Sequence, residues 1–213
     1  MSDFDEALEA GWNHYKNGNY VNAIVELQKA AVNGPQAALA NFRIGFCYRG
    51  LGIRSLALDH FAQAVSLEPD QAYLHRELGR QVAFCGSPLG ALEHFATSLE
   101  LDPLVPLTYH ETGACLFFLG NADLALTSYT MCGVLCDCAP PDYKTDVSLT
   151  LFTQSMLNIK TAIGEEQYQK VQSDTFEKLC FADDGPTGFT VRLERFQIVA
   201  NELAERLRQF ANA

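Results

Sequence analysis

Two consecutive stretches of 34 residues decide the fold: ALANFRIGFCYRGLGIRSLALDHFAQAVSLEPDQ at 38–71 and AYLHRELGRQVAFCGSPLGALEHFATSLELDPLV at 72–105. When one stretch is laid on the other, two glycines, an alanine, a phenylalanine and a proline fall at the same positions. The same period extends outward without a gap over residues 4–139. It therefore defines four units, 4–37, 38–71, 72–105 and 106–139, each of which must bury its apolar face against its neighbours.

The repeated positions predict a helix–turn–helix unit. Small residues let two helices cross closely, a bulky residue fills the space between them, and the second glycine ends the first helix. We expect first helices near 4–17, 38–51, 72–85 and 106–119, and second helices near 20–33, 54–67, 88–101 and 122–135. The repeated residues are Gly11, Gly45, Gly79 and Gly113; Gly18, Gly52, Gly86 and Gly120; Ala23, Ala57, Ala91 and Ala125; Leu27, Phe61, Phe95 and Tyr129.

This order of small, small, bulky, small and proline residues resembles the tetratricopeptide-repeat (TPR) family over residues 4–139. The resemblance implies an all-α fold, a right-handed α-solenoid of four TPR units followed by a helical cap. Two features depart from the family pattern. The usual aromatic residue early in the first helix is kept only as Tyr109, and Asp137 stands where the earlier units have proline.

Residues 140–213 break the period and form a C-terminal capping or extension region. Their apolar patterns predict helices near 143–162, 165–181 and 190–210. A solenoid needs its last apolar face covered, so the first of these helices is expected to cap the fourth unit. The other two can extend the superhelix, fold back over it, occupy its groove or dimerise, and the sequence leaves these alternatives open.

Composition narrows the classes of function. Fifteen basic and 26 acidic residues give a formal charge of −11, which opposes binding to nucleic acid or anionic lipid. The chain has no apolar run long enough for a membrane span, and its N-terminus lacks the features of a signal peptide. Seven cysteines without an export signal are expected to be reduced thiols. We therefore expect a cytoplasmic protein.

No motif predicts catalysis, a cofactor or a metal. Cys132, Cys136 and Cys138 form a C-x3-C-x-C cluster, but the second pair of a structural zinc site is missing. Cys132 also belongs to a series of small packing residues, so burial alone accounts for it. The five histidines lack metal-ligand spacing. The sequence therefore predicts a protein that is not an enzyme.

The first helices of TPR units line the concave side, so their exposed positions are the expected site for a protein or peptide partner. These positions are rich in aromatic residues and arginine, the types enriched in binding hot spots. Since arginine pairs with carboxylates, the expected ligand is an apolar and acidic segment. The candidate residues are Leu8, Trp12, Tyr15, Phe42, Arg43, Phe46, Arg49, Tyr73, Arg76, Arg80, Phe84 and Phe117.

Other interpretations remain open at this stage. These residues can instead pack repeat against repeat, with Arg43 and Arg80 paired to Glu77 or Glu9. A TPR subclass that binds chaperone C-termini uses Lys and Asn at inner positions, where this chain has Leu8, Trp12, Arg43, Tyr73 and Glu77, so that role is not expected. The leading hypothesis is a scaffold or adaptor. The alternatives are a bacterial secretion-type or assembly chaperone, and a self-assembling structural protein that forms homo-oligomers.

Overall fold

The computed structural model describes residues 3–32, 36–138, 149–179 and 188–213 of the chain. Within these ranges all regular structure is α-helical, in agreement with the predicted all-α class. The chain divides into two compact units, residues 1–87 and 88–213, and each is described by itself. The boundary falls between the two helices of the third repeat. The division into four repeats and a cap remains a prediction.

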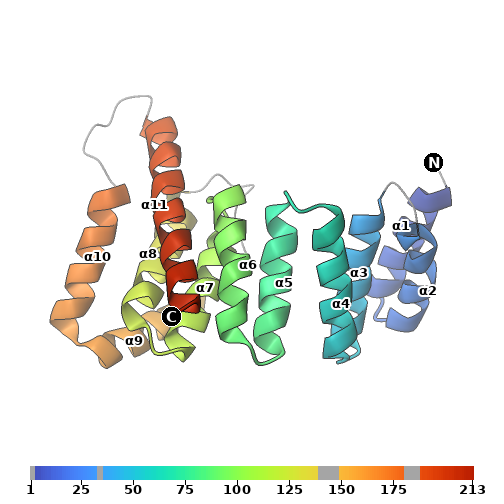
Figure 1. Cartoon of the computed structure of the whole chain (residues 1–213), viewed down its shortest axis with the longest axis horizontal. Coiled ribbons are helices and arrows are strands. Elements are labelled where there is room, and N and C mark those ends of the chain that lie inside the picture. Colours follow the sequence, from blue (N-terminus) through green and yellow to red (C-terminus); the bar gives the residue numbers. More distant parts are fainter. Residues whose placement is uncertain (1–2, 33–35, 139–148, 180–187) are drawn as a thin grey trace. The chain divides into compact units, whose positions relative to one another are not determined.

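Unit 1 is built from five helices that follow one another in antiparallel hairpins (Figure 1). Helices α1 and α3 each pack against the second helix of their own repeat, and α3 and α5 each pack against the second helix of the preceding repeat. The helix bounds lie within two residues of the predicted ones. They are α1 (Asp3–Lys16), α2 (Tyr20–Ala31), α3 (Ala37–Gly50), α4 (Arg54–Leu67) and α5 (Ala72–Phe84).

Close crossing within the hairpins of the first, second and fourth repeats depends on the first glycine of the repeat. A Cβ atom at Gly45 would lie 2.8 Å from the ring of Phe61, and one at Gly11 would lie 2.5 Å from the side chain of Leu27. The crossing between Gly113 and Tyr129 repeats this geometry in unit 2. Glycine is therefore required at these positions by the approach of the bulky residue, as the sequence predicted.

The second glycine of each repeat ends the first helix. Gly18, Gly52, Gly86 and Gly120 have φ angles of 74°, 76°, 92° and 81°. This left-handed conformation costs glycine little and lets the chain turn into the next helix. The prediction of glycine C-caps is confirmed.

One departure from the family pattern is explained by a shared hydrogen bond. The hydroxyl of Tyr109 donates to the carbonyl oxygen of Pro103 at 2.9 Å. His75, one repeat earlier, places Nε2 2.8 Å from the carbonyl oxygen of Pro69. Histidine therefore replaces tyrosine in the same local role, which ties the start of a first helix to the proline turn before it.

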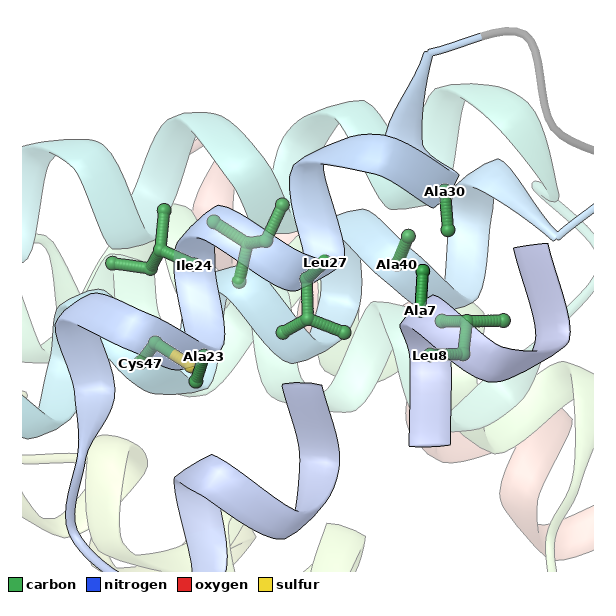
Figure 2. Close-up of a cluster of buried hydrophobic side chains, with 9 residues drawn as sticks. Ala7, Leu8, Ala23, Ile24, Leu27, Ala30, Ala40 and Cys47 are labelled. Carbon is green, nitrogen blue, oxygen red and sulfur yellow. The ribbon is translucent and has the colours of Figure 1, made fainter. Parts of the chain in front are cut away.

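The core of unit 1 begins as a cluster of small and aliphatic side chains between α1, α2 and α3 (Figure 2). Leu27 and Ala23 of α2 are fully buried, and Ala40 and Cys47 of α3 join them. Burial raises the pKa of the Cys47 thiol to about 11, so the group is protonated and behaves as a small apolar residue. A second cluster around Phe61 continues the core toward α5.

Unit 2 contains the rest of the helices that the structure describes: α6 (Pro88–Leu101), α7 (Pro106–Phe118), α8 (Ala122–Cys138), α9 (Leu149–Ile163), α10 (Glu165–Leu179) and α11 (Gly188–Ala211). Helix α8 runs three residues beyond its predicted end. Helix α9 packs on α7 and α8, where the ring of Phe152 lies 6.2 Å from that of Tyr129. Its role as the cap of the fourth repeat remains a prediction. Part of the predicted 143–162 helix lies outside the described residues.

The last helix folds back onto the second helix of the third repeat. Helix α11 runs alongside α6 (Figure 1), and α10 packs on α8. Arg208 of α11 donates to both carboxylate oxygens of Glu100, and its Nε donates to Glu93 Oε1 at 3.0 Å. The bond to Arg208 lowers the pKa of Glu100. Of the alternatives that the sequence left open, the structure has the C-terminal helix folded back within unit 2.

A Gly45→Ala exchange is expected to destabilise unit 1 by about 1–3 kcal/mol, because the added methyl group meets the ring of buried Phe61. Adding Phe61→Leu to Gly45→Ala makes room for the methyl group, so the pair should lose less than the sum of the two single exchanges. Urea unfolding monitored by Trp12 fluorescence measures both. Additive losses would contradict the close crossing.

Candidate protein-interaction face

Helices α1, α3 and α5 bring aromatic rings into one continuous band. The ring of Trp12 stacks on Tyr15 at 4.6 Å, and Tyr15 meets Phe46 edge-on at 6.2 Å. Phe46 contacts Phe42 at 4.8 Å, which in turn lies 5.1 Å from Tyr73 of α5. These distances lie within the range of favourable aromatic pairs. The five rings are all partly buried, so an edge of each remains available at the surface.

Four arginines lie along this band. Arg43 places its guanidinium 5.0 Å from the ring centre of Trp12, and Arg49 lies 4.4 Å from that of Phe46. Nη1 of Arg43 also donates to the carbonyl oxygen of Leu8 at 2.9 Å. Arg76 and Arg80 follow on α5. Stacking on the rings helps to hold Arg43 and Arg49 in place.

Glu77 is the carboxylate that the arginines share. Its side chain is only 5% exposed, and its oxygens lie 2.9 Å from Arg49 Nη1, 3.6 Å from Arg76 Nη2 and 3.8 Å from Arg80 Nη1. A buried carboxylate needs such partners, because desolvation of an unpaired charge is costly. We call the five rings, the four arginines and Glu77 the aromatic–arginine face.

The structure brings most of the predicted residues together and separates three. Leu8 is 3% exposed and belongs to the core of unit 1 (Figure 2), so it is not available to a partner. This corrects its placement among exposed positions. Phe84 lies at the end of α5, outside the ring contacts that define the face; it is 51% exposed and lies 5.7 Å from the guanidinium of Arg80. Phe117 is on α7 in unit 2 and is half-buried.

Sequence reasoning missed the central position of Glu77. Glutamate is rarely buried, so a glutamate two residues before Gly79 on a first helix indicated nothing unusual. The available signal was the surplus of arginine on α3 and α5, the first helices of two adjacent repeats, in an acidic chain. The alternative of internal pairing is correct for Arg80 and Glu77, whereas Arg43 uses a backbone carbonyl instead.

Burial changes the ionisation of two tyrosines on the face. Desolvation raises the pKa of Tyr15, and desolvation also raises the pKa of Tyr73, with a smaller contribution from Glu68. Both groups therefore stay neutral at physiological pH. The charges of the face come from arginine and Glu77 alone.

The cysteine cluster offers no metal centre in the described part of the chain. Cys132 is buried, and desolvation strongly raises its pKa, which makes the thiol a poor ligand. Cys136 is exposed, and the side chain of Cys138 lies outside what the structure describes. Among the described residues no group of three or more His, Cys, Asp or Glu side chains is arranged to hold a metal ion. Neither does any described helix combine the length and the apolar character of a membrane span.

No protein-family model matches the sequence, and a comparison with characterised proteins finds no match. Solved structures, in contrast, share the fold. The structure is similar to MamA, with a TM-score of 0.60 at 17% identity over 85% of this chain and 98% of that one. A thermophilic TPR protein of Thermus thermophilus matches with a TM-score of 0.56 at 18% identity, over 92% of this chain and 98% of that one.

A TPR protein of Parabacteroides merdae matches with a TM-score of 0.62 at 15% identity, over 96% of this chain and 77% of that one. The chain therefore has the helical-repeat fold of TPR proteins. At these identities the likeness extends to the fold alone.

Proposed function

We propose that the protein is a non-catalytic TPR scaffold that binds an apolar and acidic segment of a partner protein on the aromatic–arginine face. The observation that carries the proposal is the sharing of one buried carboxylate, Glu77, by several arginines. Arg49 and Arg76 each receive only part of its charge, and Arg43 bonds a neutral carbonyl group. The positive charges of Arg43, Arg49 and Arg76 are therefore only partly neutralised within the chain, and these side chains can bind a carboxylate of the partner.

The rings supply the second half of the recognition. Partly buried aromatic side chains on rigid helices contribute large contact area at low entropic cost. The band from Trp12 to Tyr73 is fixed by ring contacts to the core residue Phe61, at 5.8 Å from Phe42 and 5.4 Å from Phe46. A leucine or aromatic residue of the partner would pack on the ring edges while its carboxylate reaches the arginines.

The only tryptophan of the chain provides a direct readout, because Trp12 lies on the face. Three synthetic peptides of equal length separate the contributions: one of leucine and glutamate, one of leucine and lysine, and one of serine and glutamate. We expect only the leucine–glutamate peptide to change Trp12 fluorescence saturably. Equal binding of the lysine peptide would contradict the proposed recognition of acidic segments.

Arg76→Gln is expected to weaken binding of the leucine–glutamate peptide by about tenfold, since a well-formed charged hydrogen bond contributes about 1.5–3 kcal/mol. Raising the salt concentration should weaken binding further by screening, and the aromatic contacts should retain part of the affinity. Titration of Trp12 fluorescence measures both effects.

The matched control is Arg54→Gln. It removes the same charge from α4, where the exposed Arg54 lies off the face and donates to the carbonyl oxygen of Phe84. Binding should be unchanged. If both exchanges weaken binding equally, the effect arises from total charge and the proposed site is wrong.

A further inference from the structure

The outer surfaces of the four second helices differ in what covers them. Three positions of each helix face outward at equivalent places in the repeat. They are Val21 and Val25 in α2 with Val32 directly after its end; Ser55, Asp59 and Ser66 in α4; Leu89, Glu93 and Glu100 in α6; Asp123, Thr127 and Val134 in α8.

In unit 2, helices α10 and α11 contact several of these positions, although Leu89, Glu93 and Glu100 of α6 stay partly exposed. Glu93 and Glu100 of α6 bind Arg208 of α11. Asp123 of α8 accepts a hydrogen bond from Gln167 of α10 at 3.2 Å, and Asp123 and Thr127 line a cleft of about 220 Å³ between α8, α10 and α11. The chain thus shows how a helix packs on the outside of its own repeats.

The equivalent surfaces of unit 1 are exposed, and they differ in polarity. In α4 the three positions are polar and exposed, which suits contact with water. In α2 they are valines that are 63%, 53% and 67% exposed. Val21, Val25 and Val32 are spaced by four and seven residues, so they form one apolar stripe along the helix. Single exposed valines are ordinary, whereas a stripe at positions that are polar in α4 indicates a covered surface.

We propose that the valine stripe of α2 is an interface with α2 of a second copy of this chain, related by a two-fold axis. This surface is separate from the aromatic–arginine face, so the proposal does not depend on the proposed function. Helix α11 of a second copy is a poor occupant. The two carboxylates that hold Arg208 on α6 correspond to Val25 and Val32 on α2, and Thr97 between them corresponds to Lys29. Arg208 would therefore meet a lysine.

Helix α2 is complementary to itself when two copies run antiparallel. With the axis between residues 26 and 27, Val21 of each copy lies opposite Val32 of the other. Lys29 of one copy then lies two residues away from Glu26 of the other, measured along the helix axis. This offset is about 3 Å, which a lysine side chain spans. Within one chain the same two groups already pair at 2.6 Å. Isologous dimers require this match of a surface to itself.

The size of the helix sets the strength of the dimer. Twelve residues span about 18 Å, so the contact buries less than the roughly 1,200 Å² of a stable standard interface. Association should therefore be weak and should appear only at high protein concentration. Two chains of charge −11 also repel each other, so added salt should strengthen the dimer. This salt dependence is opposite to that expected for an acidic peptide on the aromatic–arginine face.

Sedimentation equilibrium of the full chain over a wide concentration range tests the interface. The wild-type chain should show a monomer–dimer equilibrium, and Val25→Asp should raise the dimer dissociation constant at least tenfold. Ser55→Asp adds the same charge at an exposed outer position of α4 and should leave association nearly unchanged. Unchanged circular dichroism would establish that Val25→Asp is folded. A chain that stays monomeric at high salt and concentration would overturn the proposal, as would equal effects of the two exchanges.

Exchanging the charges of Lys29 and Glu26 tests whether α2 of each copy contacts α2 of the other. Lys29→Glu and Glu26→Lys chains should each associate more weakly than wild type, because like charges then face each other. Mixed together they should form a heterodimer, since one copy presents only carboxylates and the other only ammonium groups. Mixing that restores no association would overturn the two-fold α2 contact and would leave a helix of another protein as the occupant of the stripe.

Discussion

A Glu77→Gln exchange is expected to lower the free energy of unfolding of unit 1 by about 3–5 kcal/mol, the usual cost of removing one partner from a buried ion pair. The cost is large because one carboxylate serves Arg49, Arg76 and Arg80, whose side chains are only 24%, 18% and 33% exposed. Losing the charge leaves three guanidiniums close together. Glutamine keeps the size of the side chain, so the loss is electrostatic.

Urea unfolding followed by Trp12 fluorescence measures this loss, since the only tryptophan is in unit 1. Glu9→Gln is the matched control: it removes an exposed carboxylate from α1 and should cost less than about 0.5 kcal/mol. A double exchange of Glu77→Gln and Arg49→Gln should cost less than the sum of the single ones. If Glu77→Gln unfolds at the wild-type urea midpoint, Glu77 is not the carboxylate that stabilises the face.

Phe61→Ala is expected to destabilise unit 1 by about 3–5 kcal/mol. Phe61 is fully buried and packs on Gly45. Its ring also contacts the rings of Phe42 and Phe46 on the side of the core. Alanine leaves a cavity that helices cannot close without breaking their crossing. The aromatic–arginine face should loosen as well, so binding of the leucine–glutamate peptide should fall in the folded variant.

Two controls separate these effects. Phe84→Ala removes a ring that is 51% exposed, so it should cost less than about 1 kcal/mol. Phe95→Ala removes the equivalent buried ring one repeat later, in unit 2. We expect Phe95→Ala to shift the Trp12 transition less than Phe61→Ala does. Equal shifts would show that the two units unfold as one.

Most of the fold could be predicted because the repeat specifies it locally. The second glycine of each repeat ends the first helix through its φ angle, and the first glycine admits one bulky side chain, so short-range chemistry determines the hairpins. The place of α11 could not be predicted in this way. It depends on Arg208 meeting Glu93 and Glu100, and charged residues of this kind occur on any exposed helix surface.

The aromatic–arginine face was predictable only in outline. Counting from the first glycine selects the correct helix side for Trp12, Phe42 and Arg76, because equivalent positions of a repeat face the same way. The same count fails at Leu8, which is equivalent to Phe42 in the repeat but lies in the core cluster of α1, α2 and α3. The burial of Glu77 depends on three side chains from two helices, and no local pattern encodes that arrangement.

The contact between α11 and α6 also has a consequence for the order in which the protein folds. Neighbouring repeats join residues close in sequence, and such local contacts form rapidly. Arg208 and Glu100 are separated by 108 residues, so their bond is among the least local in unit 2. A chain emerging from the ribosome can complete unit 1 early, since domains fold in the order of synthesis. The side of α6 that α11 contacts therefore stays uncovered until the residues of α11 have been synthesised.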